Sequence, residues 1–243
     1  MNLIIDVGNT LVKTAVFKGD KILNEYKFEQ NLFLNKVEEI FNSYPDITHS
    51  IISSVGKLPE NSLKALSVFC KVHQLSNKSK IPFKNLYATP ETLGVDRIAL
   101  ITAAYYEYQQ ENTLIIDAGT CITYDFLDNQ GAYHGGAISP GINMRFKALN
   151  TFTANLPLIK SISTDNLIGN STTNSIVSGV VNGAINEIEG IINKYSQKFE
   201  GLTIILTGGD GDFLSKRLKS SIFANSIFLL IGLNHILELN KCE

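Results

Sequence analysis

Two short stretches of the chain combine an aspartate, a glycine and a threonine. The first is Asp6-Val7-Gly8-Asn9-Thr10, and the second is Asp117-Ala118-Gly119-Thr120. Each stretch follows an apolar run, Leu3-Ile4-Ile5 or Leu114-Ile115-Ile116, so leucine, both isoleucines, aspartate and glycine recur at a shift of 111 residues. An alternating segment and a polar turn follow each copy, which predicts the same β-hairpin made twice.

The residue types at these two hairpin tips are those that bind phosphate. Glycine has no Cβ, so the main chain can approach a bulky anion, and the turn amides and the threonine hydroxyl can donate hydrogen bonds to it. The aspartate can orient a hydrated cation that offsets the phosphate charge. A single Asp-x-Gly turn is more often an ordinary tight hairpin, but two copies in one register favour a two-lobed polyphosphate clamp.

A second candidate for chemistry lies between the two hairpins, in Gly94-Val95-Asp96-Arg97. Apolar residues from Asp96 to Tyr108 recur at helical spacing, which places Asp96 in the first turn of a helix. There the carboxylate can be a helix cap and nothing more. Beside a polyphosphate, however, a carboxylate can accept the proton of an alcohol, while the arginine orients an anionic acceptor. The sequence therefore indicates phosphoryl transfer, with Asp96 as the general base.

Two further glycine-rich segments are weaker candidates for a ligand site. We expect Gly135-Gly136-Ala137-Ile138-Ser139-Pro140-Gly141 to form a turn before a helix over 142–149, whose start can meet an anion. Thr207-Gly208-Gly209-Asp210 follows the apolar run 202–206, at the carboxyl end of a predicted strand, where α/β sheets bind ligands. It can hold the nucleoside part of a nucleotide, although a plain strand-to-helix turn explains the glycine pair equally well.

The elements that would position these residues make two α/β lobes. In the first lobe, strands are expected over 3–7, 11–17, 21–28, 47–55 and 71–75, and helices over 32–41 and 59–69. The second lobe repeats the hairpin, then has a long helix with an apolar stripe and the strand 202–206. We place the boundary so that the lobes span residues 1–112 and 113–243. The stripe, which includes Ile176, Val180, Ala184 and Ile188, belongs either to the core or to a subunit interface.

Composition excludes several classes of protein. The 243 residues are 44% hydrophobic and 18% charged, with a net charge of −2, which is typical of a globular domain and provides no basic surface for nucleic acid. The three cysteines have no metal or redox spacing, which favours a reducing compartment. The longest apolar run near the C-terminus, 227–233, is far too short for a bilayer, and the N-terminal run is interrupted by Asp6, unlike a signal peptide. We therefore expect a cytoplasmic protein that contacts neither nucleic acid nor membrane.

Taken together and in order, these motifs resemble the type III pantothenate kinases. The resemblance is carried by four segments, Asp6 to Lys13, Gly94 to Arg97, Asp117 to Thr120 and Thr207 to Gly209, and covers nearly the whole chain. It implies an α/β fold of duplicated actin-like, or ribonuclease H-like, lobes with an ATP cleft between them. It also implies ATP-dependent phosphorylation of pantothenate, the first step towards coenzyme A.

The resemblance further implies roles for individual residues. Asp96 is the implied catalytic base, Asp117 the implied ligand of a monovalent cation (K⁺ or NH₄⁺), and Asp6 the implied partner of Mg²⁺, directly or through water. The implied ATP-binding residues are Asp6, Val7, Gly8, Asn9, Thr10, Leu11, Val12, Lys13 and Thr120. The implied pantothenate-binding residues are Tyr87, Gly94, Val95, Asp96, Arg97 and Thr172. The family is homodimeric, which gives the apolar stripe of the long helix a purpose.

Two other functions remain open on the sequence alone. The same family contains accessory proteins named for effects on transcription, so a non-catalytic ligand-binding regulator is one alternative. A kinase of another small alcohol is the second. The presence of Asp96, Arg97 and both Asp-x-Gly turns favours an active enzyme.

Overall fold

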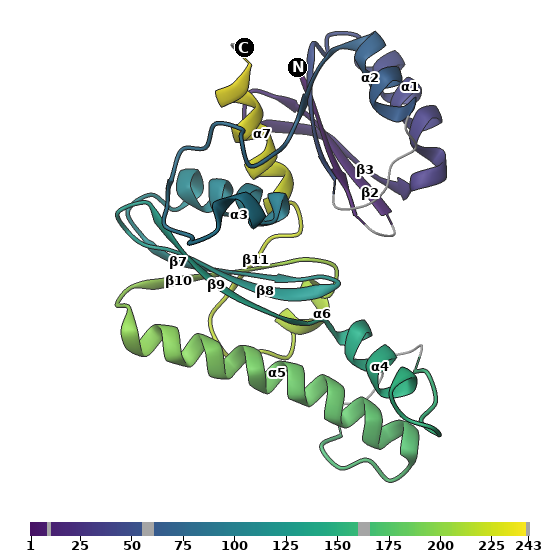
Figure 1. Ribbon diagram of the computed structural model, residues 1–243, viewed down its shortest axis with the longest axis vertical. Coiled ribbons are helices and arrows are strands. Elements are labelled where there is room, and N and C mark those ends of the chain that lie inside the picture. The colour runs from purple at the N-terminus through teal and green to yellow at the C-terminus, as the bar shows by residue number, and fades with distance from the viewer. Residues whose placement is uncertain (9–10, 55–60, 160–165, 242–243) are drawn as a thin grey trace. The chain divides into compact units, whose positions relative to one another are not determined.

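The computed structural model describes residues 1–8, 11–54, 61–159 and 166–241, which form two compact units (Figure 1). The first unit is made of Met1–Gln109 together with Ile227–Glu243, and the second is made of Gln110–Ser226. Each unit contains a mixed β-sheet, as expected for two α/β lobes.

The sheet of the first unit has the strand order β3-β2-β1-β4-β5. The first three strands are antiparallel neighbours, while β4 and β5 add in parallel to β1. All five strands were predicted from the sequence to within a few residues, although Val55 lies outside the described residues. Their bounds are β1 Asn2–Val7, β2 Leu11–Lys18, β3 Lys21–Glu29, β4 His49–Ser54 and β5 Lys71–Gln74.

The second unit repeats this plan strand for strand. Its strands run in the order β9-β8-β7-β10-β11, again three antiparallel neighbours followed by two parallel additions. The two aspartates take equivalent places, because Asp6 pairs with Lys13 and Asp117 with Thr123, but the tip of the second hairpin is one residue shorter. The predicted duplication is therefore confirmed. The bounds are β7 Asn112–Ala118, β8 Cys121–Leu127, β9 Ala132–Pro140, β10 Leu202–Thr207 and β11 Phe223–Ala224.

In the first unit, helices α1 (Phe33–Ser43) and α2 (Asn61–Phe69) cover one face of the sheet. Alternate residues of β1 point to this face, and Leu3, Ile5 and Val7 are fully buried there. The helix predicted over 32–41 is thus confirmed, with a short 3₁₀ turn, Gln30–Leu32, in front of it. A two-residue strand, β6 (Lys84–Asn85), and a 3₁₀ turn, Pro90–Thr92, lie in the segment 76–92, which was expected to be irregular.

In the second unit, α4 (Ile142–Thr151) and the long α5 (Thr172–Lys198) pack on the equivalent face. The α5 side chains of the predicted apolar stripe, such as Val180, Ala184 and Ile188, are buried against β7 and β8 residues, so the stripe belongs to the core of this unit. The short helix α6 (Gly211–Ser215) follows β10. Among the helices of the described ranges, none combines the length and the apolar character needed to span a bilayer.

Helices α3 (Val95–Glu107) and α7 (Phe228–Asn240) each follow the last strand of a sheet, and they pack against each other within the first unit. The expected division at residue 112 agrees with the structure to within a few residues, but the expected second lobe, 113–243, differs from it because α7 belongs to the first unit. The reason is that most of α7 is apolar and buried, so the helix must be enclosed. It is covered by α3, β1 and β4.

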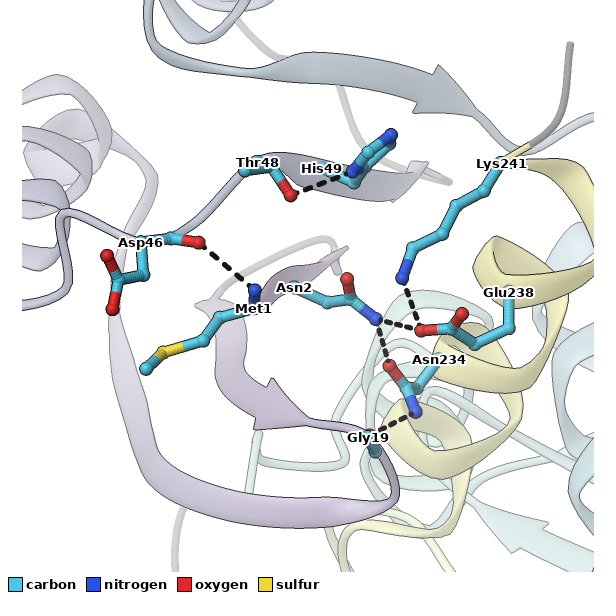
Figure 2. A network of polar contacts seen from close by, with 9 residues as sticks. All are labelled: Met1, Asn2, Gly19, Asp46, Thr48, His49, Asn234, Glu238 and Lys241. Atoms are coloured by element: carbon cyan, nitrogen blue, oxygen red, sulfur yellow. Dashed lines mark hydrogen bonds and ion pairs between the residues drawn. The ribbon is translucent and has the colours of Figure 1, made fainter.

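Polar contacts join α7 to the start of β1, the central strand of the first sheet, and to the β2–β3 turn (Figure 2). Asn2 Nδ2 on β1 donates to Asn234 Oδ1 at 2.8 Å and to Glu238 Oε1 at 2.7 Å. Asn234 Nδ2 in turn donates to the Gly19 carbonyl in the β2–β3 turn, at 3.1 Å. Asn234 is 1% exposed, so its amide is satisfied entirely by the protein.

One element differs from the sequence-based expectation. The segment 135–140, predicted to be a glycine-rich turn, is the second half of β9 and pairs with β8. Gly136 allows β9 to lie close to β8, because a Cβ at this position would collide with the Tyr124 carbonyl. The helix expected after it is confirmed as α4, with Gly141 as its N-cap.

Candidate active site

The first hairpin holds Asp6 at the end of β1. Asp6 lies opposite Lys13 on β2, and the tip is closed by the Gly8 N–H, which donates to the Leu11 carbonyl at 3.1 Å. Val7 and Val12 form the neighbouring pair and are both fully buried, so they fix the hairpin from the core side. Asn9 and Thr10, the other two predicted phosphate-binding residues of this tip, lie outside the described residues.

Asp96 lies in the first turn of α3, as predicted, and its carboxylate is held in one orientation. Asp96 Oδ1 accepts a hydrogen bond from the Arg97 N–H at 2.8 Å. The same oxygen lies over the main chain of Gly94, where any Cβ would collide with it. A side chain at position 94 would therefore displace the carboxylate from this orientation, and within the described residues the other oxygen of Asp96 is left for another partner.

Arg97 and Tyr87, both predicted to bind the substrate, lie together. The Arg97 guanidinium carbon lies 5.5 Å from the centroid of the Tyr87 ring. Arg97 is only 5% exposed, and stacking on an aromatic face suits a buried guanidinium, which is weakly hydrated. The ring and the helix start thus fix a cation beside Asp96. Val95 is the first residue of α3.

The charges of Asp6, Lys13 and Asp96 interact. Burial raises the pKa of Asp6 to about 6, Lys13 opposes this rise, and the negative charge of Asp96 adds to it. Two carboxylates brought together in this way favour a cation between or beside them. The structure therefore unites the predicted phosphate-binding aspartate, the predicted lysine and the predicted base, although they lie in separate parts of the sequence.

The residues present fit a hydrated divalent cation. Mg²⁺ usually keeps several of its waters and binds through one or two carboxylates together with substrate phosphates. Asp6 and Asp96 supply such carboxylates. Within the described ranges, no three histidine, cysteine or acidic residues cluster in a way that would enclose a metal ion.

The second unit holds the other predicted residues, at the end of β7. The Gly119 N–H donates to the Cys121 carbonyl at 2.9 Å and closes this tip, which is one residue shorter than the tip that Gly8 and Leu11 close in the first hairpin. The Asp117 carboxylate lies close to two glycines, because a Cβ at Gly119 would be 3.5 Å from Asp117 Oδ1 and one at Gly208 would collide with it. Thr120 is exposed at the tip.

The third glycine segment, Thr207 to Asp210, lies directly beside this hairpin. Gly208 has a φ of 95°, which L side chains rarely adopt, and the Asp210 N–H donates to the Ala118 carbonyl at 2.9 Å. Burial raises the pKa of Asp210. The main chain of Asp210 is thus bonded to the end of the second hairpin.

Thr172, a predicted substrate contact, is the first residue of α5 and is exposed. The preceding residue, Ser171, is the N-cap, and its hydroxyl accepts from the Asn174 N–H at 3.2 Å. Thr172, Thr120 and Asp117 belong to the second unit, whereas Asp6, Asp96 and Arg97 belong to the first.

One polar residue beside Asp6 has no counterpart in the sequence motifs. Ser53 on β4 pairs with Asp6 in the parallel register of β1 and β4, and it is fully buried. A serine at the end of a strand carries no recognisable spacing, so the sequence offered no signal for it.

Comparison with known proteins identifies relatives over the full length. A family model described as type III pantothenate kinase matches residues 2–194. The type III pantothenate kinase of Christiangramia forsetii is 53% identical over 243 residues, which is 100% of both chains. That of Bacteroides fragilis strain YCH46 is 43% identical over 242 residues, covering 99% of each chain.

Solved structures support the fold. A conserved putative Baf family transcriptional activator from Campylobacter jejuni superposes with a TM-score of 0.62 at 22% identity, covering 99% of this chain and 100% of that one. The Listeria monocytogenes protein Lmo2764, a putative N-acetylmannosamine kinase, gives 0.53 at 11% identity, with 99% of each chain covered. At these identities the likeness concerns the fold alone, and it confirms the predicted fold class of duplicated actin-like lobes.

Proposed function

The chain belongs to the type III pantothenate kinase family, and we propose that it transfers the γ-phosphoryl group of ATP to the hydroxyl of pantothenate. The product is 4′-phosphopantothenate, the first intermediate on the way to coenzyme A. The observation that carries this proposal is the coincidence of a full-length family match with a carboxylate, Asp96, fixed beside a second carboxylate at a phosphate-type hairpin.

Asp96 is the general base of this reaction. One oxygen of Asp96 accepts a hydrogen bond from the Arg97 N–H. The other oxygen can accept the proton of the pantothenate hydroxyl while the hydroxyl oxygen of pantothenate attacks the γ-phosphorus. The bond between the γ-phosphorus and its bridging oxygen breaks, and ADP leaves. Because phosphoryl transfer depends mainly on positioning and charge, the fixed orientation of Asp96 is its main contribution.

Pantothenate carries a carboxylate, and the segment from Gly94 to Arg97 together with Tyr87 binds it in this proposal. Arg97 presents forked N–H donors that suit a carboxylate, and Tyr87 supports the guanidinium from one side. Thr172 adds a hydroxyl from the start of α5.

ATP is held by the two glycine hairpins, through Asp6 to Lys13 and through Thr120. Main-chain amides of a glycine tip donate to phosphate oxygens, and Lys13 adds a positive charge. The Mg²⁺ that accompanies ATP offsets phosphate charge, with Asp6 as its protein partner through water. Asp117 binds a monovalent cation, K⁺ or NH₄⁺, supported by the neighbouring main chain of Ala118.

We also propose that the protein works as a homodimer in the cytoplasm. The support in the structure is a set of apolar side chains that are open to water at the end of α4 and before α5. Phe152 is 85% exposed, Ile168 is 83% exposed and Leu167 is 77% exposed. Large apolar side chains with this much exposure suit a surface that a second chain covers.

The test is ADP release by the purified protein with ATP and Mg²⁺, with and without pantothenate, in potassium and then in sodium buffer. The proposal expects release that requires pantothenate and that is much faster in potassium. Release without a pantothenate requirement would indicate another acceptor. No release in either buffer would favour the ligand-binding regulator.

A further inference from the structure

Ser53 lies on the face of the first sheet that holds Asp6. In the parallel pairing of β1 and β4, Asp6 lies beside Ser53 and Ile5 lies beside Ile52. Ile5 and Ile52 pack in the core under α1 and α2, and side chains alternate along a strand, so Asp6 and Ser53 both point to the opposite face. On the other side of Asp6, its partner on β2 is Lys13, so Ser53, Asp6 and Lys13 are neighbours across three strands.

The Ser53 hydroxyl is buried. Ser53 is 0% exposed, and within the described residues its Oγ has no hydrogen-bond partner. A buried hydroxyl left unpaired costs roughly 1 to 3 kcal/mol. Among the described residues nothing pairs with this hydroxyl in the protein without ligand, and its position beside Asp6 points to a partner that comes with the ligand.

The neighbours of Ser53 define what that partner is. Asp6 lies on the adjacent strand, where strands are about 4.8 Å apart, and α3, which carries Asp96, contacts β4. Two carboxylates accept hydrogen bonds and attract cations, whereas a hydroxyl both donates and accepts. A water of a hydrated cation suits this set, since it can donate to the carboxylates and to the serine.

We propose that Ser53 Oγ binds a water in the hydration shell of the divalent cation that accompanies ATP, and that Ser53 is thereby a positioning residue for that cation. This inference rests on the proposed function, because it requires a nucleotide with its Mg²⁺ at the first hairpin. It adds a residue that neither the phosphate motifs nor the base and substrate segment contain.

The test compares Ser53→Ala with wild type and with Thr14→Val. Thr14 is a matched control, because its Oγ1 is also buried and unpaired within the described residues, but it lies beside Ile5 on the α1 and α2 face. ATP binding to the full chain is measured by calorimetry over a series of Mg²⁺ concentrations, and thermal unfolding is measured without ligand.

We expect Ser53→Ala to raise the Mg²⁺ concentration for half-maximal ATP binding about fivefold, which is the factor that one net hydrogen bond is worth. At saturating Mg²⁺ its ATP affinity should return to within about twofold of wild type. Thr14→Val should leave the Mg²⁺ requirement unchanged. Without ligand, both variants should unfold at the wild-type temperature or above it, because each loses an unpaired buried hydroxyl.

Three results would overturn the inference. An unchanged Mg²⁺ requirement in Ser53→Ala would show that Ser53 does not position the cation. Weaker ATP binding at every Mg²⁺ concentration would instead indicate direct contact with a phosphate. A lower unfolding temperature without ligand would give the hydroxyl a structural role. If wild type binds no ATP at any Mg²⁺ concentration, the proposed function itself fails, and this inference fails with it.

Discussion

Gly232 on α7 lies directly against the main-chain carbonyl of Ala99 on α3, with no room for a Cβ between them. Ala99 is three residues beyond Asp96, so this contact is less than one helical turn from the proposed base. The last helix of the chain thus supports the helix that positions the chemistry.

Replacing Gly232 with alanine should force α3 and α7 apart. In an open helix this change would stabilise the protein by about 0.5–1 kcal/mol, but here we expect a loss of about 1–3 kcal/mol in the free energy of unfolding. Because α3 moves with Asp96, kcat should fall while the unfolding transition remains cooperative. Urea unfolding measures the free energy of unfolding, and steady-state kinetics measure kcat.

The control for this substitution is Gly183→Ala in α5. Gly183 is also inside a helix, but a Cβ there would meet nothing within 4 Å. This variant should be as stable as wild type or more stable, with normal kcat. Equal free energies of unfolding and equal kcat in the two variants would contradict the close packing of α3 on α7.

Asp96→Asn should abolish turnover and preserve nucleotide binding. The asparagine oxygen can still accept from the Arg97 N–H, so the helix start remains intact, but the side chain can no longer take a proton. We expect kcat to fall by a factor of about 100 or more, with the ATP dissociation constant within about threefold of wild type. Asp20→Asn, in the exposed β2–β3 turn, is the control. Near-normal turnover in Asp96→Asn would reduce Asp96 to a helix cap.

Asp6→Asn should change how stability depends on pH. The folded protein raises the pKa of Asp6 from 3.8 to about 6, mainly by burial, so it binds this proton more tightly than the unfolded chain does. The wild type therefore loses stability as pH rises through this window, and asparagine, which is neutral, does not. Without nucleotide or Mg²⁺, we expect the variant to be roughly 3 kcal/mol more stable than wild type near pH 7.5 and equal to it near pH 3.5. Urea titrations at several pH values test this, and a constant difference across them would contradict it.

Asn234→Ala should loosen α7. The substitution leaves the Gly19 carbonyl without its side-chain donor and removes one acceptor of Asn2 Nδ2, which keeps Glu238 (Figure 2). We expect a loss of about 1–3 kcal/mol in the free energy of unfolding. Asn24→Ala, where the asparagine amide bonds to Tyr26 at the surface, should change it by less than about 0.5 kcal/mol. A comparable loss of unfolding free energy in both variants would show that the buried network stabilises the protein no more than a surface hydrogen bond does.

The sequence predicted the parts of the fold that local patterns determine. The two hairpins follow from buried apolar runs that end in Asp-x-Gly turns, and α3 follows from its helical spacing after Gly94. These signals reside in neighbouring residues. The same holds for the site residues Asp6, Asp96 and Arg97, which lie in short recognisable segments, and the structure places these three residues in the same unit.

Features that depend on distant contacts could not be predicted. Helix α7 is mostly apolar, and its pattern does not say which core will enclose it. The segment 135–140 contains glycines that look like a turn, yet Gly136 serves the close approach of β9 to the Tyr124 carbonyl. Ser53 acquires its position beside Asp6 only through strand pairing between parts of the chain 47 residues apart.

The return of α7 to the first unit has a consequence for synthesis of the protein. The second unit is an insertion, complete in sequence by Ser226, while the first waits for a helix made more than 200 residues after β1. At ordinary elongation rates this delay is roughly 10 to 50 seconds. During that time the apolar residues of β1 and β4 that α7 will cover are open to other chains and to chaperones on the ribosome. The inserted unit can therefore finish folding before the unit that emerged first.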